Sequence, residues 1–357
     1  MNNTEYKTTG QKLPPLWGGL GRGCAIAILN WNGKGFLEKF LPSVIEYSCS
    51  ETTAVYVIDN ASTDNSVAFL QANYPNIPLI QLDKNYGFAE GYNKGLAQIS
   101  AEYFVLLNSD VQVTPNWVEP VIAYMDAHKN CAAAMPKLLS YARPDYFEYA
   151  GAAGGFIDRY GFPFCNGRLF SEVQKDCGQY NEIKEIFWAS GAALFVRSEV
   201  YWQCGGLDAD FFAHMEEIDL CWHIKNAGHS IMYIPQSTVY HVGGGALPAS
   251  SPFKTYLNFR NNLYLLYKNL PDKNFLCTLF ARMVLDGVAF IQFALTGKFG
   301  DAKSVLKAHR DFYKALPDLK KKRKALQQQH KAVQHPQMYR KSIVWDFYVR
   351  GKKTIEM

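Results

Sequence analysis

The chain has 357 residues, of which 48% are hydrophobic and 15% aromatic, so it can form one large or two modest domains with a full core. Its net charge of +5 is small for this length and argues against a nucleic-acid-binding protein. Eight cysteines stand at irregular spacings without a C-x-x-C pair, which disfavours a zinc ribbon and favours reduced thiols in the cytoplasm.

The first 23 residues are polar and then rich in proline and glycine. They lack the apolar core of a signal peptide, so we expect a flexible leader over residues 1–23. The pattern beyond it predicts an α/β domain over residues 24–253 and a helical C-terminal region over residues 254–357.

Up to about residue 115, short buried strands alternate with segments of helical periodicity. The expected strands cover 24–32, 53–60, 77–83 and 103–110, and the expected helices cover 35–48, 62–74 and 88–100. Such an alternation with short connections predicts a parallel, doubly wound sheet. Open sheets of this kind bind ligands beyond the carboxyl ends of their strands, so the polar residues at those ends form the candidate site.

The pattern is looser after Pro115. The expected elements are a helix over 117–128, a strand over 131–139, a loop or hairpin insertion over 141–182, a strand over 185–200 interrupted at Ser190-Gly191, a helix over 215–228, and a strand running into a glycine loop over 230–245. From residue 254 the chain reads as helical until a basic tail.

Residues 275–295 are long and apolar enough to span a membrane, but Arg282 and Asp286 lie in their middle. Each charge costs about 2.5–3.5 kcal/mol at a bilayer centre, and a spacing of four places both on one helical face, where they can pair. We therefore expect an amphipathic helix, either packed on protein or lying in a membrane interface. The basic run at 320–324 suits an anionic surface, and equally a solvated helix.

The first motif is VIDNASTD, residues 57–64, where Asp59 ends a strand and polar residues open a helix. Helix capping explains Ser62, Thr63 and Asp64, but not the carboxylate of Asp59 ahead of them. A carboxylate at that place can accept hydrogen bonds from a nucleobase or a ribose hydroxyl. No G-x-G-x-x-G follows the first strand, which disfavours a nicotinamide enzyme.

Two further motifs lie at the ends of expected strands. In KNYGFAEGYNKG, residues 84–95, glycines at a helix start let backbone N–H groups approach a phosphate or a sugar. In NSD, residues 108–110, Asp110 suits a hard divalent cation that also holds phosphates, although an aspartate in such a place is usually a turn residue.

The remaining candidates are acidic residues and a histidine. Glu216, Glu217 and Asp219 lie in the first turn of a helix, where acids complement the helix dipole, and one of them is a candidate general base. His241 stands at a strand end before three glycines. A lone histidine is more often structural, yet this one is placed to partner Asp110 at a metal-bound diphosphate.

Seven segments, in this order and spacing, resemble the family 2 glycosyltransferases and, within them, the bacterial rhamnosyltransferase-like group. They are AILNWNG, VIDNASTDNS, NYGFAEGYNKG, LLNSDV, SGAALFVR, EEIDLCWHIKNAG and VYHVGG. The resemblance covers about residues 24–265. It implies a GT-A fold over residues 24–253, in which a nucleotide-binding α/β half and an acceptor half share one mixed sheet.

The resemblance also implies an activity: inverting transfer of a hexose or deoxyhexose from a nucleoside-diphosphate sugar to a hydroxyl of a glycan or lipid-linked saccharide, in surface polysaccharide synthesis. Glu217 falls where the family has its catalytic base, with Glu216 and Asp219 as alternatives. Asp110 takes the last place of the family's D-x-D metal motif, for Mg²⁺ or Mn²⁺, and His241 assists the metal or the diphosphate.

The first place of the D-x-D motif is Asn108, so the motif offers one carboxylate. The residues expected at the nucleotide-sugar are Asn30, Asn32, Asp59, Asn85, Gly87, Phe88, Asn93, Asn108, Ser190 and Gly191. The stretch from Arg260 to Asn262 resembles a family segment that closes over the site.

Two other classes stay open. A nucleotidyltransferase would need a glycine-rich basic loop after the first strand, where NWNGKGF offers one lysine. A non-catalytic nucleotide-sugar-binding module would have kept the fold and lost turnover. The sugar, the base, the acceptor and the oligomeric state, monomer or homodimer, also stay open. We expect the enzyme at the inner face of the plasma membrane through a peripheral contact.

Overall fold

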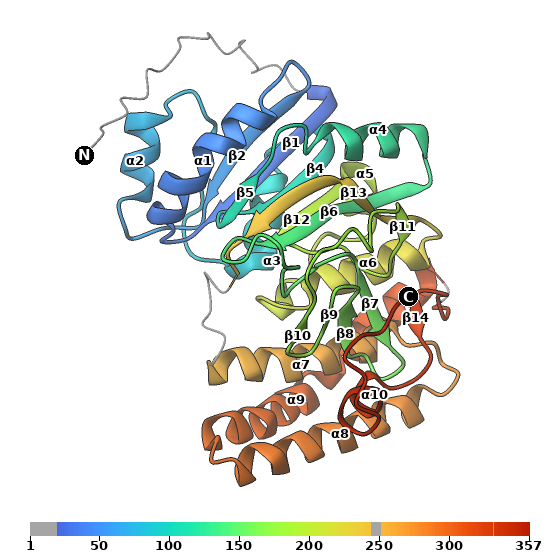
Figure 1. Cartoon of the computed structure of the whole chain (residues 1–357). Helices are drawn as coiled ribbons and strands as arrows, with labels where there is room; N and C mark the ends of the chain where they lie inside the picture. The colour runs from blue at the N-terminus through green and yellow to red at the C-terminus, as the bar shows by residue number, and fades with distance from the viewer. Residues whose placement is uncertain (1–19, 244–250, 331) are drawn as a thin grey trace, which may run out of the picture.

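A computed structural model describes residues 20–243, 251–330 and 332–357 of the chain (Figure 1). Most of the predicted leader, and the glycines after Gly243, lie outside the described residues. The first strand begins at Leu20, four residues before the start that the sequence suggested.

The first part of the chain alternates strands and helices, as predicted. The elements are β1 (Leu20–Asn30), α1 (Lys34–Ser48), β2 (Thr53–Asp59), α2 (Ser66–Asn73), β3 (Leu79–Gln81), α3 (Gly87–Leu96) and β4 (Ala101–Asn108). The strands β1 to β4 pair parallel to one another, and their side chains fill the core on both faces. Helix α3 packs so closely on the sheet that a Cβ on Gly95 would lie 2.2 Å from Ile58 Cδ1.

The second part completes a mixed sheet. Its elements are β5 (Val111–Val113), α4 (Glu119–Ala127), β6 (Cys131–Ser140), β11 (Lys184–Glu185), β12 (Ala193–Arg197), α5 (Ser198–Gln203), the 3₁₀ turn η1 (Ala209–Phe211), α6 (Glu216–Asn226) and β13 (Ser230–His241). The strand order is β11-β13-β6-β12-β4-β1-β2-β3, with β12 antiparallel to β4 and β5 beside β13. The strand expected over 185–200 was too long, because the chain enters the sheet at Ala193 and turns into α5 at Ser198.

The insertion after β6 is folded rather than a plain loop. It forms β7 (Gly155–Asp158), β8 (Pro163–Cys165), β9 (Arg168–Leu169) and β10 (Glu172–Val173), in a second sheet of order β10-β9-β8-β7-β14. The strand β14 (Met338–Tyr339) comes from the far end of the chain and pairs parallel to β7. The C-terminal part is therefore not purely helical.

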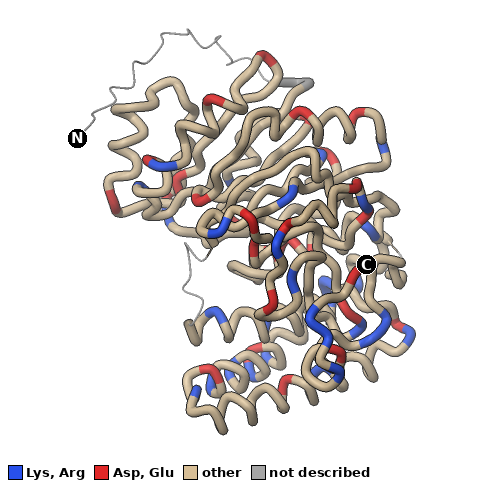
Figure 2. Tube along the Cα trace, in the orientation of Figure 1, with Lys and Arg blue, Asp and Glu red and all other residues tan. Residues whose placement is uncertain are grey.

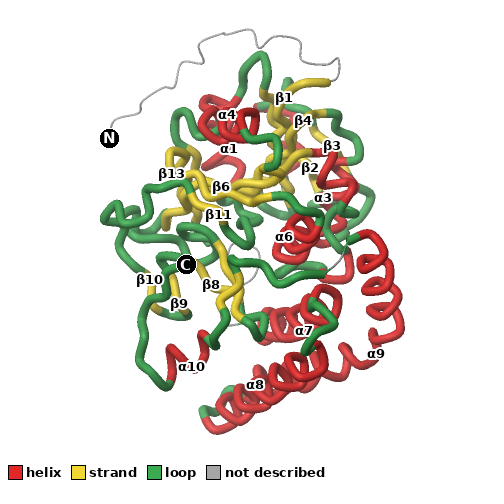
Figure 3. Tube along the Cα trace, turned by 90° about the vertical axis from the view of Figure 1, so that its right-hand side faces the viewer, coloured by secondary structure: helices red, strands yellow, loops and turns green. Residues whose placement is uncertain are grey.

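Four helices carry the rest of the C-terminal part: α7 (Pro252–Asn269), α8 (Phe275–Leu295), α9 (Phe299–Gln329) and α10 (Ile343–Tyr348). Figures 1 and 3 place α8 on the outside, with α7 between it and the large sheet. The predicted basic tail is part of α9, a continuous helix despite Pro317.

Ion pairs, of which those of Lys268 are the most buried, tie these helices to the sheet domain. Lys268 of α7 lies 2.6 Å from Asp219 of α6 and 2.5 Å from Asp208. Lys322 of α9 lies 2.6 Å from both Asp208 and Asp210. The pKa of Asp208 is well below its usual range, because the two lysines outweigh the effect of burial. The C-terminal helices are therefore docked on the loop that leads into α6.

Candidate active site

The carboxyl ends of the central strands meet at one rim of the large sheet. The register places Asn30 beside Asp59 and Leu29 beside Asn108. Asn108 N also donates to Ala192 O at 3.0 Å, which joins the start of β12 to the same place. Side chains from β1, β2, β4 and the loop before β12 therefore gather at this rim.

Asp59 and Asn30 form a buried polar pair at the rim. Asn30 Nδ2 donates to Asp59 Oδ2 at 3.0 Å and to Ser62 Oγ at 3.1 Å, and Ser62 N donates to Asp59 Oδ1 at 2.9 Å. Asn30 Oδ1 is buried and has no hydrogen-bond partner within the described residues. This arrangement fixes the Asp59 carboxylate and leaves one amide oxygen available as an acceptor.

The neighbouring asparagines shape two loops beside this pair. Asn32, with a left-handed φ of 51°, accepts from Thr63 N at 2.7 Å and Asp64 N at 3.2 Å. Asn85 accepts from Gly87 N at 2.8 Å and from Asn60 Nδ2 at 3.0 Å. These bonds hold the loops after β1, β2 and β3 against one another.

Asp110 and His241 lie together, as their predicted roles require. His241 Nε2 is 3.1 Å from Asp110 Oδ1, and His241 Nδ1 is 3.3 Å from Glu148 Oε1. Burial lowers the pKa of His241, but the two carboxylates raise it to about 10, so the imidazole is a cation between two anions. For Asp110 the two effects are reversed. Burial raises the pKa of this carboxyl, but the contact with His241 lowers it by more, so the pKa of Asp110 lies below its ordinary value.

Glu148 was missed in the sequence. It lies in the insertion, in an aromatic and glycine-rich stretch without periodicity, and it is 4% exposed. Ser190 holds that stretch in place by donating from its hydroxyl to Ala150 O, and a Cβ on Gly151 would meet Ser190 at 2.7 Å. The contribution of Ser190 is thus to position the loop that carries Glu148.

The three acids of α6 lie in different environments. Asp219 accepts from Lys268 and from Asn269 Nδ2 at 2.7 Å, so its oxygens are bonded inside the protein. Glu216 is buried, and burial together with the charge of Glu217 raises its pKa well above the ordinary value. Burial raises the pKa of Glu217 to about 7. Glu217 therefore ionises near neutrality, and the pKa of its neighbour Glu216 is raised as well.

Glu217 lies next to Gly191 and Phe88, two residues expected at the rim. A Cβ placed on Gly191 would lie 3.7 Å from Glu217 Cβ and 3.6 Å from the Phe88 ring. Within the described residues Glu217 Oε2 has no hydrogen-bond partner. Asn108, at the end of β4, bonds to Ala192, the residue after Gly191, so the α6 turn that carries Glu217 lies next to the end of β4.

The segment before α6 is held in a strained form. Phe212, His214 and Met215 all have left-handed φ values, which cost about 1–3 kcal/mol each in residues other than glycine. Asn261 Nδ2 lies 2.7–2.9 Å from the carbonyl oxygens of Phe211, Ala213 and His214. Asn261 thus clamps the turn that presents Glu216 and Glu217, and Arg260 adds bonds to Asp210 O at 2.9 Å and Phe211 O at 3.0 Å.

Two expectations need correction. Asn93 does not face the rim: its side chain is bonded to Tyr201 Oη at 2.7 Å, Leu207 O at 2.7 Å and Leu207 N at 3.1 Å. Asn262 does not close over the site, because it donates to Gly161 O in the insertion and accepts from Arg282 of α8. Both amides are used to pack the protein.

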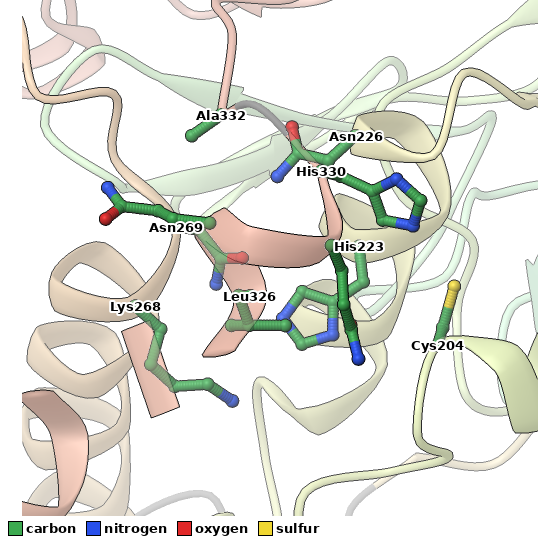
Figure 4. A pocket seen from close by; sticks show the side chains of 10 residues that line it. Cys204, His223, Asn226, Lys268, Asn269, Leu326, His330 and Ala332 are labelled. Atoms are coloured by element: carbon green, nitrogen blue, oxygen red, sulfur yellow. The ribbon is translucent and has the colours of Figure 1, made fainter. Parts of the chain in front are cut away.

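A small polar pocket lies elsewhere, at the far end of α6 (Figure 4). Its lining includes Cys204, His223, Asn226, Lys268 and His330. Asn226 ends the helix that Glu216 begins, and eleven residues of helix span about 16 Å. The pocket is therefore separate from the rim.

Comparisons with known proteins agree with this arrangement. The family profile described as glycosyl transferase family 2 matches residues 25–159. The chain is 26% identical over 223 residues to an N-acetylglucosaminyl-diphospho-decaprenol L-rhamnosyltransferase of Mycobacterium tuberculosis, which covers 57% of this chain and 71% of the relative.

Two solved structures show the same fold at 14% identity. The structure of S. aureus TarS 1–349 with UDP-GlcNAc has a TM-score of 0.55 and covers 84% of this chain and 83% of its own. That of GalNAc-T7 with UDP, GalNAc and Mn²⁺ has a TM-score of 0.56 and covers 70% of this chain, which spans 48% of that longer protein. Over residues 25–159 the chain thus matches the family 2 glycosyltransferases, its fold is the GT-A fold of the solved structures, and a rhamnosyltransferase is among its relatives.

Proposed function

We propose that the chain transfers a hexose or deoxyhexose, with inversion, from a nucleoside-diphosphate sugar to a hydroxyl of a glycan or lipid-linked saccharide. The observation that carries this proposal is that the same rim has an ionisable Glu217, beside Gly191, and the Asp110–His241–Glu148 cluster, at the end of β4. One carboxylate can take a proton from the acceptor, and the cluster lies where a diphosphate would leave.

The other rim residues then bind the donor. Asp59 and Asn30 face the base or ribose, and the backbone at Asn85, Gly87 and Phe88 approaches the sugar or diphosphate. Gly91, in the same motif, serves packing instead, because a Cβ there would meet Leu29 and Asn60 at 3.0–3.2 Å. Gly191 places no side chain between Phe88 and Glu217, so the backbone there can approach the donor closely. The acceptor oxygen attacks the anomeric carbon from the side opposite the leaving diphosphate.

Among the three acids we assign the base to Glu217. Asp219 is paired with Lys268, and burial and the charge of Glu217 raise the pKa of Glu216 well above its ordinary value. Glu216 and Glu217 each have one carboxylate oxygen without a hydrogen-bond partner among the described residues, but Glu217 is the one whose pKa, about 7, lies near the working pH of a general base.

We also propose a divalent cation, Mg²⁺ or Mn²⁺, held by Asp110 with His241 beside it. The cluster fits: it has hard oxygen donors, it lies at the strand ends, and His241 can lose a proton when a cation arrives. Among the described residues, however, no group of three or more His, Cys, Asp or Glu side chains is already arranged as a metal site. A bound cation would neutralise the departing diphosphate.

The proposed setting is the inner face of the plasma membrane, with a peripheral contact near a lipid-linked acceptor. Support comes from the relative of Mycobacterium tuberculosis, whose name includes diphospho-decaprenol. In the described chain, α8 is long and apolar enough to cross a membrane by length and composition. The mass of the purified enzyme in solution would show whether it is a monomer or a homodimer.

The test is incubation with a panel of nucleoside-diphosphate sugars and lipid-linked saccharides, with Mg²⁺, Mn²⁺ or a chelator. We expect release of nucleoside diphosphate, growth of the acceptor by one sugar, and loss of both with the chelator. Release of pyrophosphate from a nucleoside triphosphate and a sugar phosphate would indicate a nucleotidyltransferase instead. Binding without any release would indicate a non-catalytic module.

Replacing the clamp tests how Glu217 is positioned. Asn261→Ala removes the donor that holds three carbonyl groups of the strained turn, so we expect kcat to fall roughly tenfold to 10²-fold with little change in donor KM. The matched control is Asn258→Ala, one turn earlier on α7. If Asn261→Ala changed the thermal stability but left kcat and its pH profile intact, the positioning role would be wrong.

A further inference from the structure

Helix α8 has two very different faces. Leu276, Phe280, Val284, Val288, Ile291 and Leu295 recur at helical spacing, and their side chains are 51–82% exposed. The helix has two charged residues, Arg282 and Asp286, and both are buried. Its outward face is therefore a continuous apolar stripe without a charge, and the tube of α8 in Figure 2 is largely tan.

The inward face is fixed by a polar network. Arg282 Nε donates to Asp286 Oδ1 at 2.7 Å, Asp286 Oδ2 lies 3.1 Å from His309 Nε2 of α9, and Arg282 also donates to Asn262 of α7. The Arg282 guanidinium lies over the Phe162 ring, 4.0 Å from its centre. The pairing of Arg282 and Asp286 that the sequence predicted is thus confirmed, and it sets the rotation of α8 about its axis.

Helix α9 extends the stripe and adds charge beside it. Phe299, Leu306 and Tyr313 are exposed at intervals of seven, and Tyr313 Oη lies 3.3 Å from Met283 Sδ, so this row borders α8. On the other side of the row stand Lys303, Lys307, Arg310 and Lys314, all exposed and spaced by three or four along one helical face. Figure 2 shows the blue segments that recur along α9.

Not every basic residue of α9 belongs to this surface. Lys322 pairs with Asp208 and Asp210, and Arg323 is buried and pairs with Asp272 at 2.6 Å. Two members of the run at 320–324 therefore dock the helix on the protein. The four residues from Lys303 to Lys314 are the better candidates for an external anion, because all four are exposed, although Arg310 also lies 2.9 Å from Asp311 and Lys307 lies 4.4 Å from the centre of the Tyr256 ring.

We propose that the outward face of α8, with the bordering row of α9, lies in the plane of an anionic phospholipid bilayer. The apolar stripe enters the interfacial region, and the basic row contacts lipid phosphates. This orientation follows from the order of the rows, apolar on α8 and basic on the far side of α9. This proposal names the surface that makes the membrane contact, and it rests on the proposed function, which includes that contact.

A transmembrane placement of α8 conflicts with the inward network. Spanning would expose Arg282 and Asp286 to hydrocarbon or require their partners on α7 and α9 to enter the bilayer with them. An in-plane helix keeps these bonds and still buries the stripe. Another copy of the chain could cover an uncharged stripe, but the basic row would then face the same row of its partner, which disfavours that occupant.

The test is flotation of the full chain with vesicles of phosphatidylcholine, with and without phosphatidylglycerol. We expect binding that requires the anionic lipid and weakens in high salt. Changing Phe280 and Ile291 to aspartate should lower the partition coefficient by at least about tenfold, and so should changing the four basic residues to glutamine. Transfer to a water-soluble acceptor should stay unchanged in both variants, which separates this inference from the proposed activity.

Each variant has a control in which the same change of charge is made elsewhere on the surface. Ile183→Asp with Val349→Asp controls for the first variant, and glutamine at Lys39, Lys129, Lys175 and Lys184 controls for the second, because these residues are exposed elsewhere. Equal loss in variant and control, no binding at all, or release by detergent alone would each overturn the proposal. So would a wild-type dimer that the α8 aspartates convert to a monomer without any effect on flotation.

Discussion

Glu217→Gln should lower kcat by about 10²-fold or more while the enzyme still binds its donor. The amide is nearly the same size as the carboxylate, so the contacts around Gly191 and Phe88 should persist. What is lost is the group that accepts the proton from the acceptor hydroxyl. Steady-state kinetics with a saturating acceptor, together with donor binding by calorimetry, measures both quantities.

The neighbouring acids supply the controls. Glu216→Gln should have a smaller effect on kcat, because burial and the charge of Glu217 raise the pKa of Glu216 and so favour its uncharged form, which an amide resembles. Asp219→Asn should instead lower stability, since it leaves Lys268 with one carboxylate partner in a buried place. If Glu216→Gln abolished turnover and Glu217→Gln did not, the base would be Glu216.

The pH profile gives an independent check on the same residue. Glu217 must be ionised to act as a base, and its pKa of about 7 lies above the ordinary value because of burial. We therefore expect kcat/KM to rise with pH up to about 7 and to level off above it. In Glu217→Gln that rise should disappear from the residual activity.

The sequence was sufficient for the first half of the fold. Buried strands and amphipathic helices alternate there, and short connections leave few topologies. It was also sufficient to place Asp59, Asp110 and Glu217, since each follows from the end of a strand or the start of a helix. These features depend on residues that are close together in the chain.

What the sequence could not supply are contacts between distant segments. Glu148 reaches His241 from a loop 93 positions earlier, and nothing in the local pattern marks it. The bonds of Asn93 to Leu207 and of Asn261 to the turn before α6 are also contacts of this kind: the first packs the protein, and the second positions the turn. Phe212, His214 and Met215 have left-handed φ values, which their residue types do not predict from the sequence. Their conformation depends on the partner that clamps them.

The addition of β14 to the insertion is of the same kind. Met338 pairs with Ile157 over 181 positions, and the strand is two residues long. A strand so short has no periodicity to detect. It forms because β7 offers an unpaired edge at which the end of the chain can bond.

Asp110→Asn should remove nearly all metal-stimulated turnover, by about 10²-fold or more, and leave the fold intact. The side chain lies at a strand end, and its principal contact is His241, so few core contacts change. An amide binds a divalent cation more weakly than a carboxylate, and Asn108 already provides an amide at the other place of the motif. Turnover measured over a range of Mg²⁺ and Mn²⁺ concentrations should show a higher half-saturating concentration.

Glu148→Gln separates a metal role from a charge effect on His241. Glu148→Gln and Asp110→Asn each remove one of the two carboxylates that contact the His241 imidazole. The two carboxylates lie at similar distances from the ring, 3.3 Å for Glu148 and 3.1 Å for Asp110. If Asp110 acts through His241 alone, the two variants should lose turnover equally and respond to metal alike. If Asp110 binds the cation, as we propose, Asp110→Asn should shift the metal dependence more than Glu148→Gln. Near-native turnover of Asp110→Asn at low Mg²⁺ or Mn²⁺ would exclude the assignment.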